Sequence, residues 1–332
     1  MSKRIKWGII GLGKIANKFA EDLQLSNNSL LYAVASRNGE KAKIFSEKYN
    51  STKFFSSYEE LADDPDIDVI YVATPHTFHF ENTMMCLKKG KGVLCEKPMG
   101  INYQEVETMV REAELRNLFL MEGIWTRFIP ATGKLLEILE KKTIGDILFI
   151  RADFGFKADS NREGRIYNKK LGGGSLLDLG IYPIYLSLLT LGIPIDIKVM
   201  ARMTDTDVDG YCSMLFDFEN GAKAILESTI EANTPIEAYI YGSKGSLKLH
   251  RRFHHTEKIT ISQNGEKEVL DIKYKGNGYI HDIEEVNKCL LNREIESSKL
   301  PLKVSIDVIT LIDRIKKEIG LKYESIISTD IV

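Results

Sequence analysis

The sequence has 332 residues, of which 43% are hydrophobic and 28% are charged, an ordinary composition for a globular chain of about two domains. Its 45 basic and 47 acidic side chains leave a formal net charge of −2, so neither nucleic acid nor a membrane surface is an expected partner. Since no run of about 18 apolar residues and no signal peptide is recognisable, we predict a cytoplasmic protein without a membrane span. The cysteines form no C-x-x-C pair and are expected to be reduced: Cys86, Cys95, Cys212 and Cys289.

The first part of the chain alternates strands with helices. Apolar runs predict strands at 5–10, 30–37, 53–55, 68–74, 92–96 and 118–122. Helical periodicity and capping residues predict helices from 14 to about 25, at 39–49, after 57, at 78–89 and at 102–116. This alternation is typical of right-handed β-α-β units, so we expect an α/β Rossmann domain with a doubly wound parallel sheet over residues 1–123.

A glycine motif connects the first strand to the first helix. Residues 11–16, GLGKIA, fit G-x-G-x-x-A in the context that gives this pattern its meaning. Gly11 permits a tight turn, Gly13 lets the backbone approach a pyrophosphate, and Ala16 keeps helix and strand close. Lys14 and Ile15 begin the helix whose N–H groups would face the phosphates. We therefore predict a dinucleotide cofactor.

The end of the second strand predicts which dinucleotide is bound. An NAD site usually has an acid there, whereas this chain has Ser36 and Arg37. Arg37 can bind a 2′-phosphate through charge-assisted hydrogen bonds worth roughly 1.5–3 kcal/mol each, so we predict NADP in preference to NAD. The alternative is that Arg37 is a surface cation or stacks on the adenine of either cofactor.

Residues 124–332 predict a second domain of a different kind, an α+β domain with a large, mostly antiparallel open sheet. Strands are expected at 147–156 and in six further runs between 195 and 262, with tight hairpins at Asn220-Gly221, Lys244-Gly245 and Asn264-Gly265. Helices are expected at 132–142, within 172–192 and at 302–319, the last of which can pack back on the first domain. Because one face of such a sheet needs cover, we predict a homodimer packed sheet to sheet.

Four motifs occur in the order and at the spacing of the Gfo/Idh/MocA oxidoreductase family, which the chain resembles over nearly its full length. They are GLGKIA at 11–16, ATPHTFH at 73–79, GKGVLCEKP at 90–98 and GGGSLLDLGIY at 172–182. MEGIWTRFIPA at 121–131 and DLGIYPI at 178–184 are most similar to the branch that contains dimeric dihydrodiol dehydrogenase and NADP-dependent D-xylose 1-dehydrogenase. The resemblance implies hydride transfer between a nicotinamide and a carbinol or carbonyl of a sugar, cyclic diol or small carbonyl compound.

The resemblance also implies the site residues. Lys97 of the E-K-P motif is expected beside the nicotinamide, with a cis bond to Pro98, and Asp178 matches the family aspartate. Tyr182 stands where most members carry histidine; the dihydrodiol dehydrogenase branch shares this change and uses the tyrosine as acid/base. Further cofactor contacts are expected at Thr74, Pro75, His76, His79, Glu96 and Lys97. Substrate contacts are expected at Trp125, Arg127, Phe154, Asp178 and Tyr182, although Trp125 and Phe154 are equally typical of a core.

The energetics of a tyrosine base can be checked. A tyrosine that acts near neutrality must lower its pKa from about 10 by about 2–3 units, which corresponds to about 3–4 kcal/mol. A lysine ammonium about 4 Å away supplies about 4 kcal/mol at an effective dielectric constant near 20. We therefore hypothesise that Lys97 tunes Tyr182, that Tyr182 takes the hydroxyl proton, and that Asp178 orients the substrate or Lys97.

Two histidines and a basic run are the other noticeable patterns of the sequence. His76 and His79 are spaced like metal ligands, but no cysteine or acid cluster accompanies them, so no metal is predicted. Residues 250–255, HRRFHH, are typical of a hairpin edge or a solvated face. A non-catalytic NAD(P)-binding sensor would be expected to lack Lys97 or its partners, and an NAD-dependent glycosidase of the same fold would favour an acid near residue 36.

Overall fold

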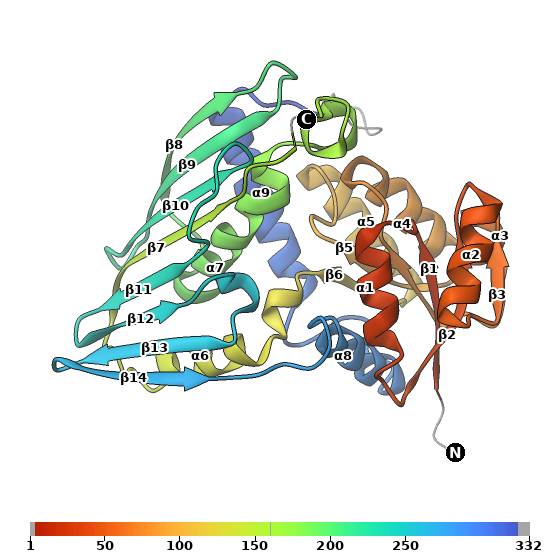
Figure 1. The fold of residues 1–332 in the computed structure, drawn as a ribbon, viewed down its shortest axis with the longest axis horizontal. Coiled ribbons are helices and arrows are strands. Elements are labelled where there is room, and N and C mark those ends of the chain that lie inside the picture. Colours follow the sequence, from red (N-terminus) through yellow and green to blue (C-terminus); the bar gives the residue numbers. More distant parts are fainter. Residues whose placement is uncertain (1–3, 160, 325–332) are drawn as a thin grey trace. The chain divides into compact units, whose positions relative to one another are not determined.

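The computed structural model describes residues 4–159 and 161–324 and divides into two compact units. The first unit contains the described residues up to Trp125 together with Lys275–Ile306. The second unit contains Thr126–Tyr274 and Asp307–Glu324. Figure 1 shows the elements of both units.

A six-stranded parallel sheet forms the centre of the first unit. Its strands follow the order β3-β2-β1-β4-β5-β6, which confirms the predicted doubly wound sheet (Figure 1). Their bounds are β1 (Ile5–Ile10), β2 (Ser29–Ala35), β3 (Lys53–Phe55), β4 (Val69–Val72), β5 (Gly92–Glu96) and β6 (Leu120–Gly123). The order reverses between β1 and β4, and a crevice for ligands opens beyond the carboxyl ends of strands at such a point.

Helices cover this sheet, and side chains cap several of them. The helices are α1 (Lys14–Leu23), α2 (Gly39–Tyr49), α3 (Tyr58–Asp63), α4 (His79–Lys88), α5 (Tyr103–Arg116) and α8 (Ile280–Leu291). The side chains of Asn38, Ser57 and Asn102 accept backbone N–H bonds at the starts of α2, α3 and α5. These local signals explain why the helix starts could be predicted.

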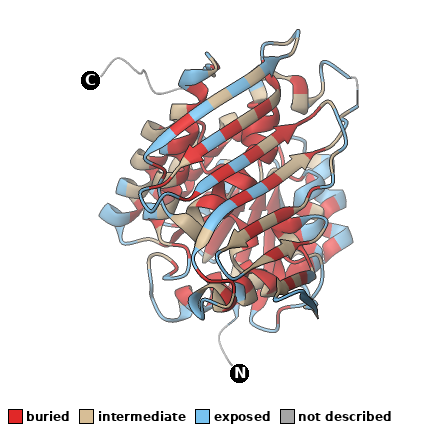
Figure 2. Cartoon of the chain, turned by 90° about the vertical axis from the view of Figure 1, so that its left-hand side faces the viewer, coloured by how far each residue is buried: buried red, intermediate tan, exposed pale blue. Residues whose placement is uncertain are grey.

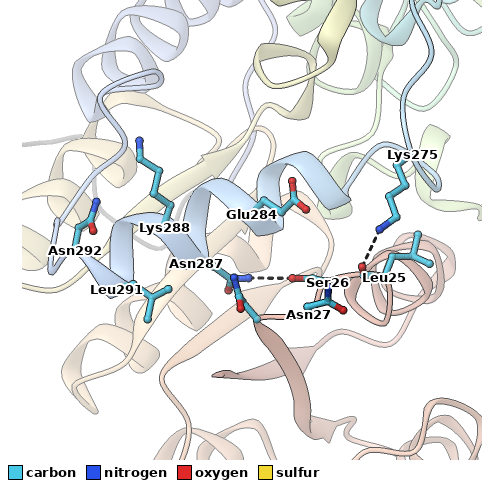
Figure 3. A pocket seen from close by; sticks show the side chains of 10 residues that line it. Leu25, Ser26, Asn27, Lys275, Glu284, Asn287, Lys288, Leu291 and Asn292 are labelled. Atoms are coloured by element: carbon cyan, nitrogen blue, oxygen red, sulfur yellow. Dashed lines mark hydrogen bonds between the residues drawn. The ribbon is translucent and has the colours of Figure 1, made fainter. Parts of the chain in front are cut away.

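Helix α8 belongs to the first unit, contrary to the prediction of one continuous second domain from residue 124 to 332. The buried Asp22 carboxylate of α1 accepts the backbone N–H of Asn277 at 2.7 Å and that of Ile280 at 3.1 Å, so it holds the start of α8. Asn287 of α8 accepts the indole N–H of Trp7 at 3.0 Å and donates to Ser29 at 2.7 Å. Figure 3 shows Asn287 pointing toward Ser26 beside an open hollow of about 430 Å³. Residues 25–28 line the hollow and lie directly before β2, so the hollow is at the amino-terminal end of that strand.

An eight-stranded sheet forms the second unit, in the order β14-β13-β12-β11-β7-β10-β9-β8. Strands β7 and β10 are parallel and the other neighbours are antiparallel, as predicted for a mostly antiparallel sheet. The bounds are β7 (Ile147–Gly155), β8 (Asp196–Met203), β9 (Asp209–Asp217), β10 (Lys223–Thr229), β11 (Ala238–Gly242), β12 (Gly245–Leu249), β13 (Lys258–Gln263) and β14 (Glu266–Asp271). The predicted hairpin at Asn264-Gly265 implied a strand after it, but the extent of β14 was not predicted, because its sequence EKEVLD is largely polar.

One face of this sheet is packed and the other is open. Helices α6 (Pro130–Glu140) and α7 (Ile181–Leu191) contact it, α7 against β7 and β10 and α6 against β13. Helix α9 (Leu302–Glu318) begins in the first unit and continues in the second. Figure 2 shows buried and exposed residues alternating along the strands, the pattern of a sheet with one covered face.

One helical stretch, Lys169–Leu191, is long and apolar enough to cross a membrane by length and composition alone. However, 83% of its most apolar window is buried inside the protein. It therefore has the character of a core helix, and it holds the GGGSLLDLGIY motif.

Candidate functional site

The loop after β1 has the shape that a pyrophosphate requires. Gly11 has a φ of +83°, and a Cβ atom there would lie 2.6 Å from the backbone carbon and oxygen of Ala73, so only glycine fits. A Cβ at Gly13 would meet only the Gly11 carbonyl oxygen, at 4.0 Å, so the backbone is open to a ligand. Lys14 and Ile15 are exposed at the start of α1, whereas Ala16 is fully buried. The residues fit a dinucleotide phosphate group.

A cavity of about 260 Å³ lies beyond the ends of β2 and β4. Arg37, Ser57, Tyr58, Thr74, Pro75 and Phe78 are among the residues that line it. The Arg37 guanidinium lies 5.7 Å from the centre of the Phe78 ring. Burial raises the pKa of Tyr58, and the charge of Arg37 opposes that rise. The neighbouring Ser36 is buried and its hydroxyl accepts the N–H of Asn38, so it shapes the turn that presents Arg37.

Three side chains hold the backbone of the turn that carries Lys97. The N–H of Lys97 donates to Glu96 at 3.2 Å, and the N–H of Met99 donates to Glu122 at 2.8 Å. The carbonyl oxygen of Pro98 lies 2.7 Å from His79 Nδ1. The Lys97–Pro98 peptide bond is cis, as the resemblance implied. The backbone of Lys97, at the end of β5, is therefore fixed by hydrogen bonds to its own N–H group and to the two residues that follow it.

His79 links this turn to the neighbouring strand end. Its second ring nitrogen, Nε2, lies 2.8 Å from the carbonyl oxygen of Thr74, which follows β4, and the ring is fully buried. Both ring nitrogens thus face backbone carbonyl oxygens. Within residues 4–159 and 161–324, no group of three or more His, Cys, Asp or Glu side chains is arranged to hold a metal ion. His76 is also buried, with its ring centre 5.7 Å from that of His79.

Asp178 lies on a π-helical turn, Leu176–Gly180, in the second unit. Arg165 Nη1 lies 3.0 Å and 2.9 Å from its two carboxylate oxygens. Beneath this turn, the buried Asp209 accepts the Ser175 hydroxyl at 2.6 Å and the Leu176 N–H at 2.7 Å. Burial raises the pKa of Asp209 to about 7. The glycines before the turn allow this approach, since a Cβ at Gly174 would lie 2.2 Å from Asp209 Oδ1.

Tyr182 follows one turn later, on α7, inside an aromatic cluster. Its ring centre is 5.5 Å from Phe154 and 4.6 Å from His254, and Phe154 stacks on His254 at 4.5 Å. The prediction of a hairpin edge or solvated face for residues 250–255 is wrong for Phe253 and His254, which are both buried. Phe253 packs edge-on against Phe154 and carries His254 inward with it. The basic residues of this run led to the prediction of a solvated face, so the contact between His254 and Tyr182 was not predicted.

Two further predicted substrate residues, Trp125 and Arg127, lie where the sequence passes from the first unit to the second. Trp125 is buried and stacks on Tyr279 at 4.8 Å within the first unit. Arg127 is half-buried and belongs to the second unit. Tyr279 was not considered from the sequence, since it lies before a helix that was not predicted.

Comparison with known proteins identifies the family. Residues 5–124 match the profile described as "Oxidoreductase family, NAD-binding Rossmann fold", and residues 132–248 match "GFO/IDH/MocA C-terminal domain". The chain belongs to the Gfo/Idh/MocA oxidoreductase family. The predicted family, its two-part fold and its NAD(P)-binding oxidoreductase character are thereby confirmed.

Individual relatives are similar along nearly the whole chain. Trans-1,2-dihydrobenzene-1,2-diol dehydrogenases of Xenopus tropicalis and Mus musculus are each 36% identical, over 96% of this chain and 99% and 98% of theirs. The structure of a 3-ketoreductase from Actinomadura kijaniata, in complex with NADP and TDP-benzene, has a TM-score of 0.86 at 26% identity, with 96% and 98% of the two chains covered. An aldose-aldose oxidoreductase from Caulobacter crescentus, complexed with glycerol, has a TM-score of 0.87 at 22% identity over 95% and 97%, and supports the fold alone.

Proposed function

We propose that this family member is an NADP-preferring dehydrogenase or reductase that acts on a CH–OH group of a small diol or sugar, or on the matching carbonyl. The observation that carries the proposal is the Lys97 turn, whose three backbone groups are held by Glu96, His79 and Glu122 at the carboxyl edge of the dinucleotide-binding sheet. A turn held this firmly presents one lysine to the ligand crevice.

The cofactor would be held by the Gly11–Ala16 loop and by the cavity beside Arg37. When bound, the nicotinamide supplies the chemistry of accepting or donating a hydride. NADP preference is supported by Arg37, because its guanidinium lines that cavity and no acid follows Ala35 to repel a 2′-phosphate. The A. kijaniata relative was solved with NADP, which agrees with this proposal.

Three side chains of this chain would handle the proton and the substrate oxygen. Tyr182 takes the hydroxyl proton during oxidation and returns it during reduction. The Lys97 ammonium stabilises the tyrosinate and the substrate oxygen. Asp178, fixed by Arg165 in the second unit, orients the substrate or the lysine. The aromatic cluster of Phe154, Tyr182 and His254 favours a flat or ring-shaped substrate, as do the names of the relatives.

The test measures the change in nicotinamide absorbance with NADP⁺ and with NAD⁺, using D-xylose, D-glucose and a trans-dihydrodiol as substrates. Turnover is expected with NADP⁺, and Lys97→Met and Tyr182→Phe are each expected to lower kcat by about 10²- to 10⁴-fold. Binding of NADPH, followed by its fluorescence, should persist in both variants, since the fold is retained. An active Lys97→Met variant would contradict the mechanism, and NADPH binding without turnover in the unmodified protein would favour a sensor.

A further inference from the structure

Glu122 is a buried acid that holds the Lys97 turn, but the proposed reaction gives no role to its charge. It lies near the end of β6, directly opposite Cys95 in the ladder between β5 and β6. Its side chain is only 3% exposed. Oε1 accepts the Met99 N–H at 2.8 Å, so the acid touches the backbone two residues beyond Lys97.

Different side chains bind the Lys97 turn on the two faces of the sheet. On one face, the Tyr71 hydroxyl donates to Glu96, whose other oxygen accepts the Lys97 N–H. On the other face, Glu122 binds the Met99 N–H, and Cys95 Sγ lies 3.7 Å from the Met99 carbonyl oxygen. Glu122 is therefore the acidic group beneath the turn on the Cys95 face, out of contact with bulk water.

The charges of Lys97 and Glu96 both act on the pKa of the Glu122 carboxyl. Burial raises its pKa to about 7, and the Glu96 charge acts in the same direction. The Ser305 hydroxyl, the Met99 N–H and the positive charge of Lys97 oppose that rise. Electrostatic coupling is mutual, so an ionised Glu122 stabilises the ammonium form of Lys97 to the extent that Lys97 favours the carboxylate.

We propose that Glu122 is a positioning residue for the reaction, which fixes the 97–99 turn through Met99 and provides the buried counter-charge of the Lys97 ammonium. The role rests on the proposed function for its catalytic meaning, but the coupling of the two charges can be measured without turnover. A merely structural Glu122 would hold Met99 and leave the chemistry of Lys97 unchanged.

The decisive experiment measures the reactivity of the Lys97 amine in the full chain. Lys97 is acetylated with isotope-coded acetic anhydride across a pH series, and its peptide is quantified by mass spectrometry. The Glu122→Gln variant keeps an acceptor for the Met99 N–H but loses the charge. At a fixed pH, Lys97 should react about tenfold faster in this variant, as expected when the pKa of an amine falls by about one unit. The reason is that only the neutral amine is acylated, and loss of the counter-charge favours that form.

Glu105→Gln is the matched control. Glu105 is equally buried and accepts the N–H of Ile101, so the substitution also removes a buried carboxylate that binds backbone just beyond the turn. Lys97 should react in this variant as in the unmodified protein. Equal Lys97 reactivity in Glu122→Gln and the unmodified protein would overturn the inference.

A second measurement separates this inference from the proposed function. With an active substrate, Glu122→Gln should lower kcat by about 10- to 100-fold, as losses of supporting residues do, while the Kd for NADPH stays within about twofold. The inflection near pH 7 that the ionisation of Glu122 causes in the pH profile of kcat should be absent in this variant. If no substrate turns over but the Lys97 labelling still shifts, the proposed function fails and the charge coupling stands. Lower thermal stability and weaker NADPH binding with unchanged labelling would show a structural role only.

Discussion

Lys97 owes its place to contacts of its backbone neighbours. Glu96, His79 and Glu122 each bind one main-chain group of the turn, and they come from β5, α4 and β6. A flexible lysine side chain gains precision in this way, because the rotations of its backbone are removed before any ligand arrives. Arg37 has a different setting, since it borders the open cavity and lies over Phe78.

Cofactor preference should depend on Arg37. In Arg37→Ala, the Kd for NADPH is expected to rise by about 10- to 150-fold because charge-assisted hydrogen bonds to the 2′-phosphate are lost, while the Kd for NADH changes little. Fluorescence titration of the reduced cofactors measures both. Equal weakening of NADPH and NADH binding would instead indicate that Arg37 stacks on adenine.

The π-helical turn is an element whose position depends on one buried acid. Asp209 accepts the Ser175 hydroxyl and the Leu176 N–H at the start of the segment that carries Asp178 and leads to Tyr182. Tyr323 adds a bond from its hydroxyl to the Gly173 carbonyl at 2.6 Å. The glycines here let polar groups approach the backbone closely. The backbone of the turn is therefore fixed by these hydrogen bonds, and the side chains of Asp178 and Tyr182 are available to the proposed site.

Asp209 should make stability depend on pH. Burial raises its pKa in the folded protein to about 7 from 3.8, so its contribution is complete below about 3.8 and is lost as the pH rises through about 7. Between pH 4 and about 7.5, the free energy of unfolding of the unmodified protein should therefore fall relative to Asp209→Asn, by on the order of 4 kcal/mol. Urea denaturation at several pH values measures this difference. Asp205→Asn, an exposed control, should show no such trend, and a pH-independent difference for Asp209→Asn would refute the prediction.

Helix α8 is held to the first unit by polar contacts that are costly to break. Asn287→Ala would leave the buried indole N–H of Trp7 and the hydroxyl of Ser29 without this partner. At about 1–3 kcal/mol for each of these two buried groups, the free energy of unfolding should fall by about 2–6 kcal/mol. Urea denaturation can compare this variant with Asn292→Ala, a change at the exposed end of the same helix that should cost little. Similar losses in both variants would contradict the role of Asn287.

At the scale of the whole molecule, the open face of the eight-stranded sheet is the feature that remains to be explained. Met200 is 78% exposed and Leu215 is 49% exposed, and Leu215 lies opposite Ile225 in the ladder. On the neighbouring strands, Phe149 lies opposite Tyr241 and stacks on it at 4.3 Å. An apolar band that crosses several strands is typical of an interface, and the homodimer packed sheet to sheet stays a prediction.

Light scattering coupled to size exclusion tests that prediction. The 37.6 kDa chain should elute with twice its mass, and a Leu215→Glu/Ile225→Glu double variant should elute as a monomer because it places charges in the apolar band. Leu115→Glu, which alters an exposed leucine on α5 of the other unit, should stay dimeric. A monomeric unmodified protein, or a dimeric double variant, would exclude this interface.

Burial protects the cysteines of this chain from reaction. All four cysteines, Cys86, Cys95, Cys212 and Cys289, are free and buried. Burial raises the pKa of each thiol, which makes them unreactive. Such cysteines need no oxidising compartment.

The parallel sheet, the dinucleotide loop, the mostly antiparallel second sheet and the family could all be predicted from the amino-acid sequence. Its signals for these features are local: strand periodicity, G-x-G-x-x-A beside a strand, side-chain caps such as Ser57, and asparagine-glycine hairpins. Each depends on residues that are near one another in the chain, so no knowledge of tertiary contacts was needed.

Contacts between residues that are distant in the chain could not be predicted and became known from the fold. Helix α8 joins the first unit because Asp22 and Trp7 bind it from more than 250 residues away. His254 packs on Tyr182 although it belongs to a run that contains two arginines. Glu122 and His79 converge on the Lys97 turn because parallel strands bring their ends to one edge of the sheet. A buried polar group needs hydrogen-bond partners, and these partners often come from distant parts of the chain. Sequence periodicity does not indicate which residues they are.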